Sequence, residues 1–259
     1  MCRHLAYLGP PVPLSRWLCD PPHSLVHQSW APREMRGTGT INADGFGVGW
    51  FPDPAGEPVR YRRECPIWTD TDLPGLAAHT AAEAALAAVR SASPGMPVVA
   101  TASAPFAGDG WLFSLNGRVA GWPGSVAGLA ARLPVAELLT LAAPVDSAGV
   151  WALLRHRLRD GAAPADAVAG TVAAVAAAAP GSRLNLLLTD GHQIVATTAG
   201  HSLSTWCDGR SVLVSSEPLD DHPAWRALPD GVLVVATPTG VDLAPLPERS
   251  LPERKADES

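Results

Sequence analysis

The chain has 259 residues, of which 47% are apolar and 17% charged, and this composition predicts a globular protein of one large or two small domains. Its net charge of −6, with no block of Lys or Arg in the body of the chain, argues against nucleic acid or an anionic membrane as a partner. The longest apolar stretch, residues 167–179, is 13 residues long and too short to span a bilayer.

The N-terminal region lacks the pattern of a signal peptide, because Arg3, His4 and several prolines interrupt any apolar segment, so a cytoplasmic protein is expected. The cysteines are widely scattered and form no C-x-x-C pair, which argues against a zinc or redox motif; they are Cys2, Cys19, Cys65 and Cys207. Four early histidines also lack metal-ligand spacing with acidic residues, and they are His4, His23, His27 and His79. The sequence therefore predicts neither a metal site nor a cofactor.

The first third of the chain predicts strands and one long loop. Residues 2–8 alternate loosely and predict a short first strand that the stretch "GPPVP" ends. Residues 20–45 are rich in Pro, Gly and polar side chains and predict a long surface excursion, a type of segment that is usually functional. Residues 45–51 predict a buried strand whose glycines allow close backbone approach, with the exposed residues 58–64 as its partner.

The rest of the chain places two helices between strands. Residues 82–92 are Ala-rich and fit a helix or a strand, whereas residues 110–122 predict a strand that enters a tight Asn-Gly turn. Helices are predicted at 147–161 and 163–181. Short strands follow, within 182–191, 192–200, 201–209, 210–218 and 231–238. This order predicts an α+β fold of antiparallel sheet with helices segregated to the outside.

Cys2 stands where its chemistry could differ from that of the other cysteines. Removal of Met1 would leave a thiol and a free α-amine on one residue, and an amine of pKa about 7.7–8.0 is a base tethered within reach of the thiol. Taken alone, the position favours a cysteine that merely packs at the end of a first strand.

Four other positions carry side chains or backbone groups that a nucleophile would need. Asn116 and Gly117 could supply two adjacent N–H donors to an oxyanion, although Asn-Gly is also a common hairpin turn. Arg90 lies in an apolar run and could clamp a carboxylate, or could sit at an exposed strand end. Asp146 precedes a helical run and could pair with an ammonium group, or could cap the helix.

Read together and in order, several segments resemble the class II glutamine amidotransferases, which are N-terminal-nucleophile hydrolases with a cysteine nucleophile. They are Cys2, "NADGFGVGW", "VRSASPGMPV", "APFAGDGWLFSLNG" and "VDSA". The resemblance covers most of the chain, from Cys2 to about Asp221. The sequence is similar in particular to one branch, the γ-glutamyl hydrolases of ergothioneine biosynthesis, through stretches such as "MCRHLAYLG", "DPPHSLVHQSWAPREM" and "SSEPLDD".

The resemblance implies a four-layer αββα sandwich of two antiparallel sheets. It would form one glutamine amidotransferase domain over residues 2–247, followed by a charged and disordered tail at 248–259. The resemblance also departs at Leu115, where relatives often carry His before the Asn-Gly pair.

The resemblance further implies a role for each site residue. Cys2 would be the nucleophile with its α-amine as the base, and Asn116 and Gly117 would form the oxyanion hole. Arg90 would hold the α-carboxylate and Asp146 the α-ammonium of a γ-glutamyl group. A loop with Asn42, Asp44 and Gly45 would lie against this small-molecule substrate.

The branch implies hydrolysis of γ-L-glutamyl-hercynylcysteine S-oxide to glutamate and hercynylcysteine S-oxide. Two alternatives stay open: a class II glutaminase that delivers ammonia to a separate synthase, and a non-catalytic γ-glutamyl-binding protein. The sequence leaves the oligomeric state undetermined. Aromatic faces bind trimethylammonium groups well, and five of the nine tryptophans lie in or near the site segments, where a cage is one interpretation and the core is the favoured one for most of them. These are Trp30, Trp50, Trp68, Trp111 and Trp122.

Overall fold

The computed structural model describes residues 2–34, 41–53 and 56–246 of the chain. Met1 and the predicted tail at 248–259 lie outside the described residues. The strands are β1 (Arg3–Pro13), β2 (Phe46–Trp50), β3 (Val59–Arg63), β4 (Ala81–Val89), β5 (Phe106–Gly108), β6 (Trp111–Arg118), β7 (Arg183–Thr189), β8 (Ile194–Thr197), β9 (Ser204–Cys207), β10 (Val212–Ser215), β11 (Arg226–Ala227), β12 (Val232–Thr237) and β13 (Gly240–Pro245). The α-helices are α1 (Ser15–Leu18), α2 (Leu25–Gln28), α3 (Leu73–His79), α4 (Ala127–Ala130), α5 (Val135–Leu139), α6 (Asp146–Arg159) and α7 (Pro164–Ala178). Short 3-10 turns are η1 (Ile67–Thr69), η2 (Ala100–Ala102) and η3 (Gly124–Val126).

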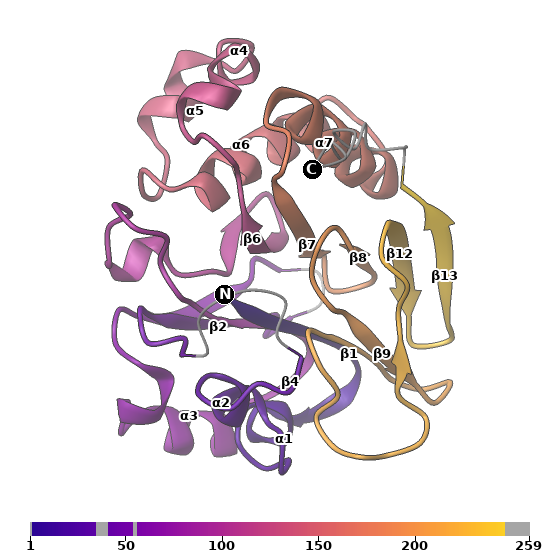
Figure 1. Ribbon diagram of the computed structural model, residues 1–259. Coiled ribbons are helices and arrows are strands. Elements are labelled where there is room, and N and C mark those ends of the chain that lie inside the picture. Colours follow the sequence, from indigo (N-terminus) through magenta and orange to yellow (C-terminus); the bar gives the residue numbers. More distant parts are fainter. Residues whose placement is uncertain (1, 35–40, 54–55, 247–259) are drawn as a thin grey trace, which may run out of the picture.

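Two antiparallel sheets stack face to face and are covered on their outer faces by helices (Figure 1). Within the described residues, one sheet has seven strands in the order β11-β9-β10-β1-β4-β2-β3, and the other has six in the order β13-β12-β8-β7-β6-β5. Helices α6 and α7 lie over the six-stranded sheet, while α1, α2 and α3 lie over the seven-stranded sheet (Figure 1). This four-layer αββα arrangement confirms the predicted fold.

Three apolar clusters fill the spaces between the four layers. One lies between the sheets and includes Leu86 of β4 and Leu187 of β7. A second packs α6 and α7 on the six-stranded sheet, where Phe113 stacks on Trp151 with ring centroids 5.3 Å apart. The third packs α1 to α3 on the seven-stranded sheet. Both faces of the central strands are therefore buried, as a sandwich with helical covers requires.

The Ala-rich segment left open by the sequence is a strand, β4, between β1 and β2. Ala85 and Ala87 belong to the cluster under the helices, whereas Ala84 and Leu86 belong to the cluster between the sheets. This period of two is that of a strand with two buried faces. Hydrogen bonds to two neighbouring strands thus override the intrinsic preference of alanine for helix.

Strand β1 is longer than the sequence predicts, and the expectation that "GPPVP" ends it is wrong. The strand runs to Pro13, and its pairing with β4 changes register between Leu8 and Val12. Strand β10 pairs with β1 only from Leu5 to Leu8. Beyond Leu8 the strand has one described partner, so prolines that lack an N–H are tolerated at this irregular end.

The predicted hairpin turn at Asn116-Gly117 is also wrong. Both residues lie inside β6, paired with Asn185 and Leu184 of β7. The buried strand β2, its exposed partner β3, helices α6 and α7 and the later short strands β7 to β10 and β12 confirm the predictions made for them. None of the helices in the described part of the chain has the length and apolarity that a bilayer crossing requires.

We expect a cavity made in the apolar layer between the sheets to lower the stability of the protein strongly. Leu187 is fully buried, so Leu187→Ala should lower the free energy of unfolding by about 2–5 kcal/mol through lost burial and an unfilled cavity. Chemical denaturation monitored by circular dichroism measures the change. Leu139 is 81% exposed, so Leu139→Ala is the matched control and should change stability little. Equal effects of the two substitutions would contradict this packing.

Candidate active site

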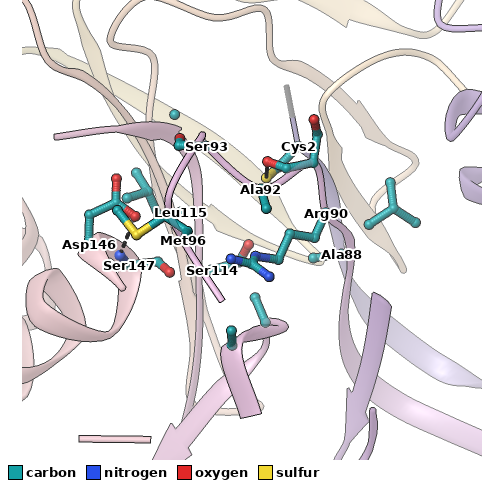
Figure 2. Close-up of a pocket in the computed structure, with 15 residues that line it drawn as sticks. Cys2, Ala88, Arg90, Ala92, Ser93, Met96, Ser114, Leu115, Asp146 and Ser147 are labelled. Carbon is teal, nitrogen blue, oxygen red and sulfur yellow. Dashed lines mark hydrogen bonds between the residues drawn. The ribbon is translucent and has the colours of Figure 1, made fainter. Parts of the chain in front are cut away.

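Cys2 directly precedes β1 and lines a cavity together with residues from distant parts of the sequence. Its side chain is half-buried, and its Sγ atom is 3.8 Å from the carbonyl oxygen of Ser91, which follows β4. The cavity is also lined by Arg90, Gly117 and Asp146. In Figure 2, Cys2 and Arg90 lie toward one side of the cavity and Asp146 toward the other.

The antiparallel pairing of β1 with β4 explains why Cys2 and Arg90 meet. Arg3 of β1 is opposite Val89 of β4, so the residue before Arg3 and the residue after Val89 lie at the same end of the strand pair. Gly117 comes from β6 in the facing sheet, and Asp146 is the first residue of α6. Four positions separated by up to 144 residues in the chain thus meet at one edge of the sandwich.

Arg90 is buried, which rules out the exposed strand end considered from the sequence. Its Nη1 atom donates to the carbonyl oxygens of Pro97 at 2.9 Å and Asp44 at 3.5 Å. A guanidinium group has five N–H donors, so these two bonds leave donors for a ligand in the cavity that Arg90 lines. The chemistry fits a carboxylate.

Asp146 is a buried carboxylate whose oxygens already accept two backbone hydrogen bonds, from Val119 N at 2.9 Å and from Ser147 N at 2.8 Å. Burial raises the pKa of Asp146, although these bonds and the charge of Arg90 act in the opposite direction. A cationic ligand in the cavity would favour the ionised form. The site therefore presents a guanidinium and a carboxylate, a pair suited to an α-amino acid.

Gly117 occupies a position that only glycine fits. Its φ of +154° is rarely adopted by other residues, and a Cβ atom there would collide with the carbonyl group of Arg183. The absence of a side chain leaves its backbone facing the cavity that Cys2 lines.

Asn116 is fully buried and is not among the residues that line this cavity. Its Nδ2 atom donates to Ser216 Oγ at 3.4 Å, and the same Ser216 Oγ accepts from His4 N at 3.0 Å. The Asn116 amide is therefore linked through one hydroxyl group to the backbone two residues after Cys2.

The loop residues Asn42, Asp44 and Gly45 are likewise not among the lining residues. They hold the segment that carries Arg90: the Asp44 carboxylate accepts from Ala92 N at 2.8 Å, and Arg90 N donates to Gly45 O at 2.8 Å. Asn42 N donates to Ser29 O at 2.7 Å and ties this loop to the end of α2. The loop thus holds in place the segment of Arg90 and Ala92 that lines the cavity, without lining the cavity itself.

The departure at Leu115 and the tryptophans singled out from the sequence also have places in the structure. Leu115 is buried and lines the cavity. None of the five tryptophans lines it. Trp30 and Trp68 are each 41% exposed and meet edge to face, and the other three are partly buried against the apolar clusters.

Sequence reasoning missed a buried ionic cluster beside Cys2. Arg3 Nη2 lies 2.9 Å from Glu217 Oε1, and His23 Nε2 lies 2.6 Å from Glu217 Oε2. The same Oε2 accepts from Arg33 N at 2.7 Å. Burial alone would raise the pKa of Glu217, but the hydrogen bond from His23 and the charge of Arg3 hold it below its ordinary value of 4.5.

A signal for part of this cluster was present in the sequence. Arg3 shares a strand face with Leu5 and Tyr7, both apolar, and a charge on a buried face requires a partner. Nothing in the local pattern identifies that partner as Glu217, 214 residues away. Among the described residues, no group of three or more His, Cys, Asp or Glu side chains is arranged to hold a metal ion.

The comparisons with known proteins agree with this geometry. No family model matches the chain. A class II glutamine aminotransferase domain protein from Silicibacter pomeroyi shares the fold, with a TM-score of 0.67 and 23% identity over 95% of this chain and 99% of that one. The glutamine phosphoribosylpyrophosphate amidotransferase from B. subtilis gives a TM-score of 0.64 and 13% identity over 95% of this chain and 49% of that one. The fold is that of class II glutamine amidotransferases, the N-terminal-nucleophile hydrolases.

Two curated relatives identify the family within this class. Gamma-glutamyl-hercynylcysteine sulfoxide hydrolase from Mycolicibacterium smegmatis is 40% identical over 246 residues, which are 95% of this chain and 100% of the relative. The protein of the same name from Mycobacterium tuberculosis is 40% identical over 95% of this chain and 97% of the relative. The chain belongs to the γ-glutamyl-hercynylcysteine sulfoxide hydrolase family.

The ionic cluster predicts a stability effect. Glu217→Gln should lower the free energy of unfolding by about 3–5 kcal/mol, because it leaves the Arg3 charge buried without its carboxylate. Urea denaturation measures the change. Asp221 is 84% exposed in its ion pair with Arg33, so Asp221→Asn is the matched control and should have little effect. A Glu217→Gln variant as stable as wild type would contradict the role given to the cluster.

His4 predicts a loss of stability in mild acid. It is fully buried, its Nδ1 atom is 3.1 Å from Ser114 Oγ, and burial with the charges of His201 and Arg3 lowers its pKa from 6.5 to about 3. Between these values the unfolded chain binds a proton that the folded chain does not. Stability should therefore fall as the pH drops below 6.5, with a contribution of about 1.4 kcal/mol per pH unit from this group.

Urea denaturation at a series of pH values between 5 and 7 measures this slope. The slope should flatten in His4→Gln and persist in the control His79→Gln, since His79 lies at the exposed end of α3. If the free energy of unfolding of His4→Gln had the same pH dependence as that of the wild type, groups other than His4 would be responsible for it.

Proposed function

We propose that this protein hydrolyses the γ-glutamyl amide bond of γ-L-glutamyl-hercynylcysteine S-oxide and releases glutamate and hercynylcysteine S-oxide. Membership of the family supports this reaction, because the relatives that carry its name are 40% identical over 95% of this chain. The observation that carries the assignment of the site is the convergence of Cys2, Arg90, Gly117 and Asp146 on one cavity.

Substrate recognition follows from the two charged groups of the cavity. Arg90 binds the α-carboxylate of the γ-glutamyl group, and bidentate guanidinium–carboxylate pairing fixes its orientation. Asp146 binds the α-ammonium group, which offsets the cost of ionising a buried carboxylate. Both groups belong to the α-carbon, so holding them leaves the glutamyl side chain to extend across the cavity and bring the γ-carbonyl carbon to Cys2.

The nucleophile acts with a base on its own residue. Once Met1 is removed, the α-amine of Cys2 accepts the thiol proton, and the thiolate attacks the γ-carbonyl carbon. The backbone N–H of Gly117 and one N–H of the Asn116 amide stabilise the oxyanion. An amide NH₂ has two donors, so the bond to Ser216 leaves one of them for this role.

The reaction is completed in two steps. The protonated α-amine gives its proton to the leaving amine of the cysteinyl product as the C–N bond breaks and the γ-glutamyl thioester forms. The neutral α-amine then takes a proton from water as the water attacks the thioester carbonyl, and the departing Cys2 thiolate recovers that proton as glutamate is released.

Substitution of Cys2 is the first test of this function. In Cys2→Ala, release of glutamate from the hercynyl substrate should fall by at least about 10³-fold, because no thioester forms. A coupled glutamate assay measures the rate. Cys65 is also half-buried but packs against the cluster under the helices, so Cys65→Ala is the matched control and should retain activity. Equal release from Cys2→Ala and wild type would remove Cys2 from the mechanism.

Two further measurements separate this function from its alternatives. Efficient turnover of free glutamine with none of the hercynyl substrate, or copurification of a synthase, would favour an ammonia-delivering glutaminase. Binding of γ-glutamyl compounds without turnover would favour a non-catalytic protein. Mass spectrometry of the active protein should give a chain that begins at Cys2, and retention of Met1 in active protein would contradict the role of the α-amine.

A further inference from the structure

A second and larger cavity lies apart from the one lined by Cys2. Its volume is about 480 Å³, within the range of about 300–1,000 Å³ typical of small-molecule sites. No lining residue is shared between the two cavities.

The seven-stranded sheet separates the two cavities. Tyr7 of β1 lines the second cavity and belongs to the apolar cluster under α1 to α3. Ala6 and Leu8, on the opposite face of β1, belong to the cluster between the sheets. Side chains alternate along a strand, so Cys2 shares the face of Ala6 and points away from Tyr7. The second cavity is thus a feature of the outer face of this sheet.

A row of side chains across three strands forms one wall of the second cavity. Tyr7 of β1 is paired with Leu213 of β10, and Leu213 is paired with Trp206 of β9. Trp17 of α1 packs on Tyr7 with ring centroids 4.4 Å apart. These four residues all line the cavity, and three of them are aromatic.

The loop after β10 supplies a further aromatic wall with a carboxylate attached to it. Trp225 Nε1 donates to Asp220 Oδ1 at 2.9 Å, which fixes the indole ring beside the carboxylate. His222 lies edge to face with Trp206, with ring centroids 6.4 Å apart. Trp206 and Trp225 are both half-buried, so part of each indole ring is open to a ligand.

The charged groups of this cavity favour a cation. Two carboxylates, Asp20 and Asp220, line it against one guanidinium, Arg16. The Asp20 carboxylate accepts a bond from Ser15 Oγ at 3.0 Å and is otherwise exposed. Aromatic faces attract cations through the ring quadrupole, and nearby carboxylates add to this attraction.

We propose that this second cavity binds a small organic cation of the quaternary ammonium type, with its methyl groups against tryptophan faces and the carboxylates at the rim. The site does not depend on the reaction proposed for Cys2. It lies on the other face of the sheet from Arg90 and Asp146, and its tryptophan and tyrosine side chains offer aromatic surface that the cavity lined by Cys2 lacks. A neutral ligand of the same shape would lose the attraction to the rings and carboxylates.

Isothermal titration calorimetry with choline chloride tests the proposal. Choline should bind saturably, and its neutral isostere 3,3-dimethylbutan-1-ol should bind about tenfold more weakly, because it lacks the charge that the aromatic faces attract. Equal affinity of the two probes would overturn the proposal, and so would the absence of saturable choline binding.

Variants locate the bound cation. Trp206→Leu should abolish choline binding, while the matched control Trp68→Leu, a change at a 41% exposed tryptophan outside the cavity, should leave it intact. Trp206→Phe keeps an aromatic face and should retain weaker binding even if the leucine variant fails to fold. Unchanged affinity in both Trp206 variants would overturn the proposal.

One more variant separates this site from the catalytic cavity. Cys2→Ala should bind choline as the wild type does, whatever its effect on glutamate release. Choline binding that is lost in Cys2→Ala but kept in Trp206→Phe and Trp206→Leu would place the cation in the catalytic cavity and overturn the second site. Loss of glutamate release in Cys2→Ala tests the proposed function alone.

Discussion

The buried ion pair between Arg3 and Glu217 is the contact on which the rest of the site depends. Cys2 lies at the beginning of its strand, and a chain end frays unless something holds it. Arg3 is the next residue, and Glu217 binds it together with His23 and the backbone of Arg33. All of these partners bind the same carboxylate of Glu217. This shared contact fixes three segments relative to one another beside the nucleophile: the start of β1, the end of β10 and the loop after α2.

Strand alternation lets β1 hold this ion pair and present a nucleophile at once. Arg3 points to the helical side of the sheet, while Cys2 and His4 point to the other. His4 donates from its backbone to Ser216, which also contacts Asn116, so the inner face links β1 to the facing sheet. The site is therefore built from strand ends and the first turn of α6, elements that are rigid because their other faces are packed into apolar clusters.

The sequence predicts the elements well wherever a local pattern determines the secondary structure. It predicts them less well where pairing with a strand far away in the chain determines it. The exposed strand β3 and helices α6 and α7 follow from periodicity and their flanking residues. Asn116-Gly117 is typical of a hairpin turn, yet the seven pairs between β6 and β7 keep it inside a strand. The ion pair of Arg3 joins residues 214 positions apart, and no pattern within a strand or helix could name its partner. The resemblance supplied the residues of the site, and the topology explains why they meet.

Three of the tryptophans near the site segments pack against the apolar clusters, as the interpretation of most of them as core residues predicts. The tryptophans near the site segments do not line the cavity that contains Cys2, whereas Trp17, Trp206 and Trp225 line the cavity on the opposite face of the same sheet. The register of β9, β10 and β1 places Trp206, Leu213 and Tyr7 side by side, a relation that only strand pairing creates. Cys2 directly precedes β1, so the residue that lines one cavity leads into the strand whose Tyr7 lines the other. A ligand on the outer face would therefore contact the same strand that positions the nucleophile. It would do so through side chains, such as Tyr7, that point away from the face on which Cys2 lies.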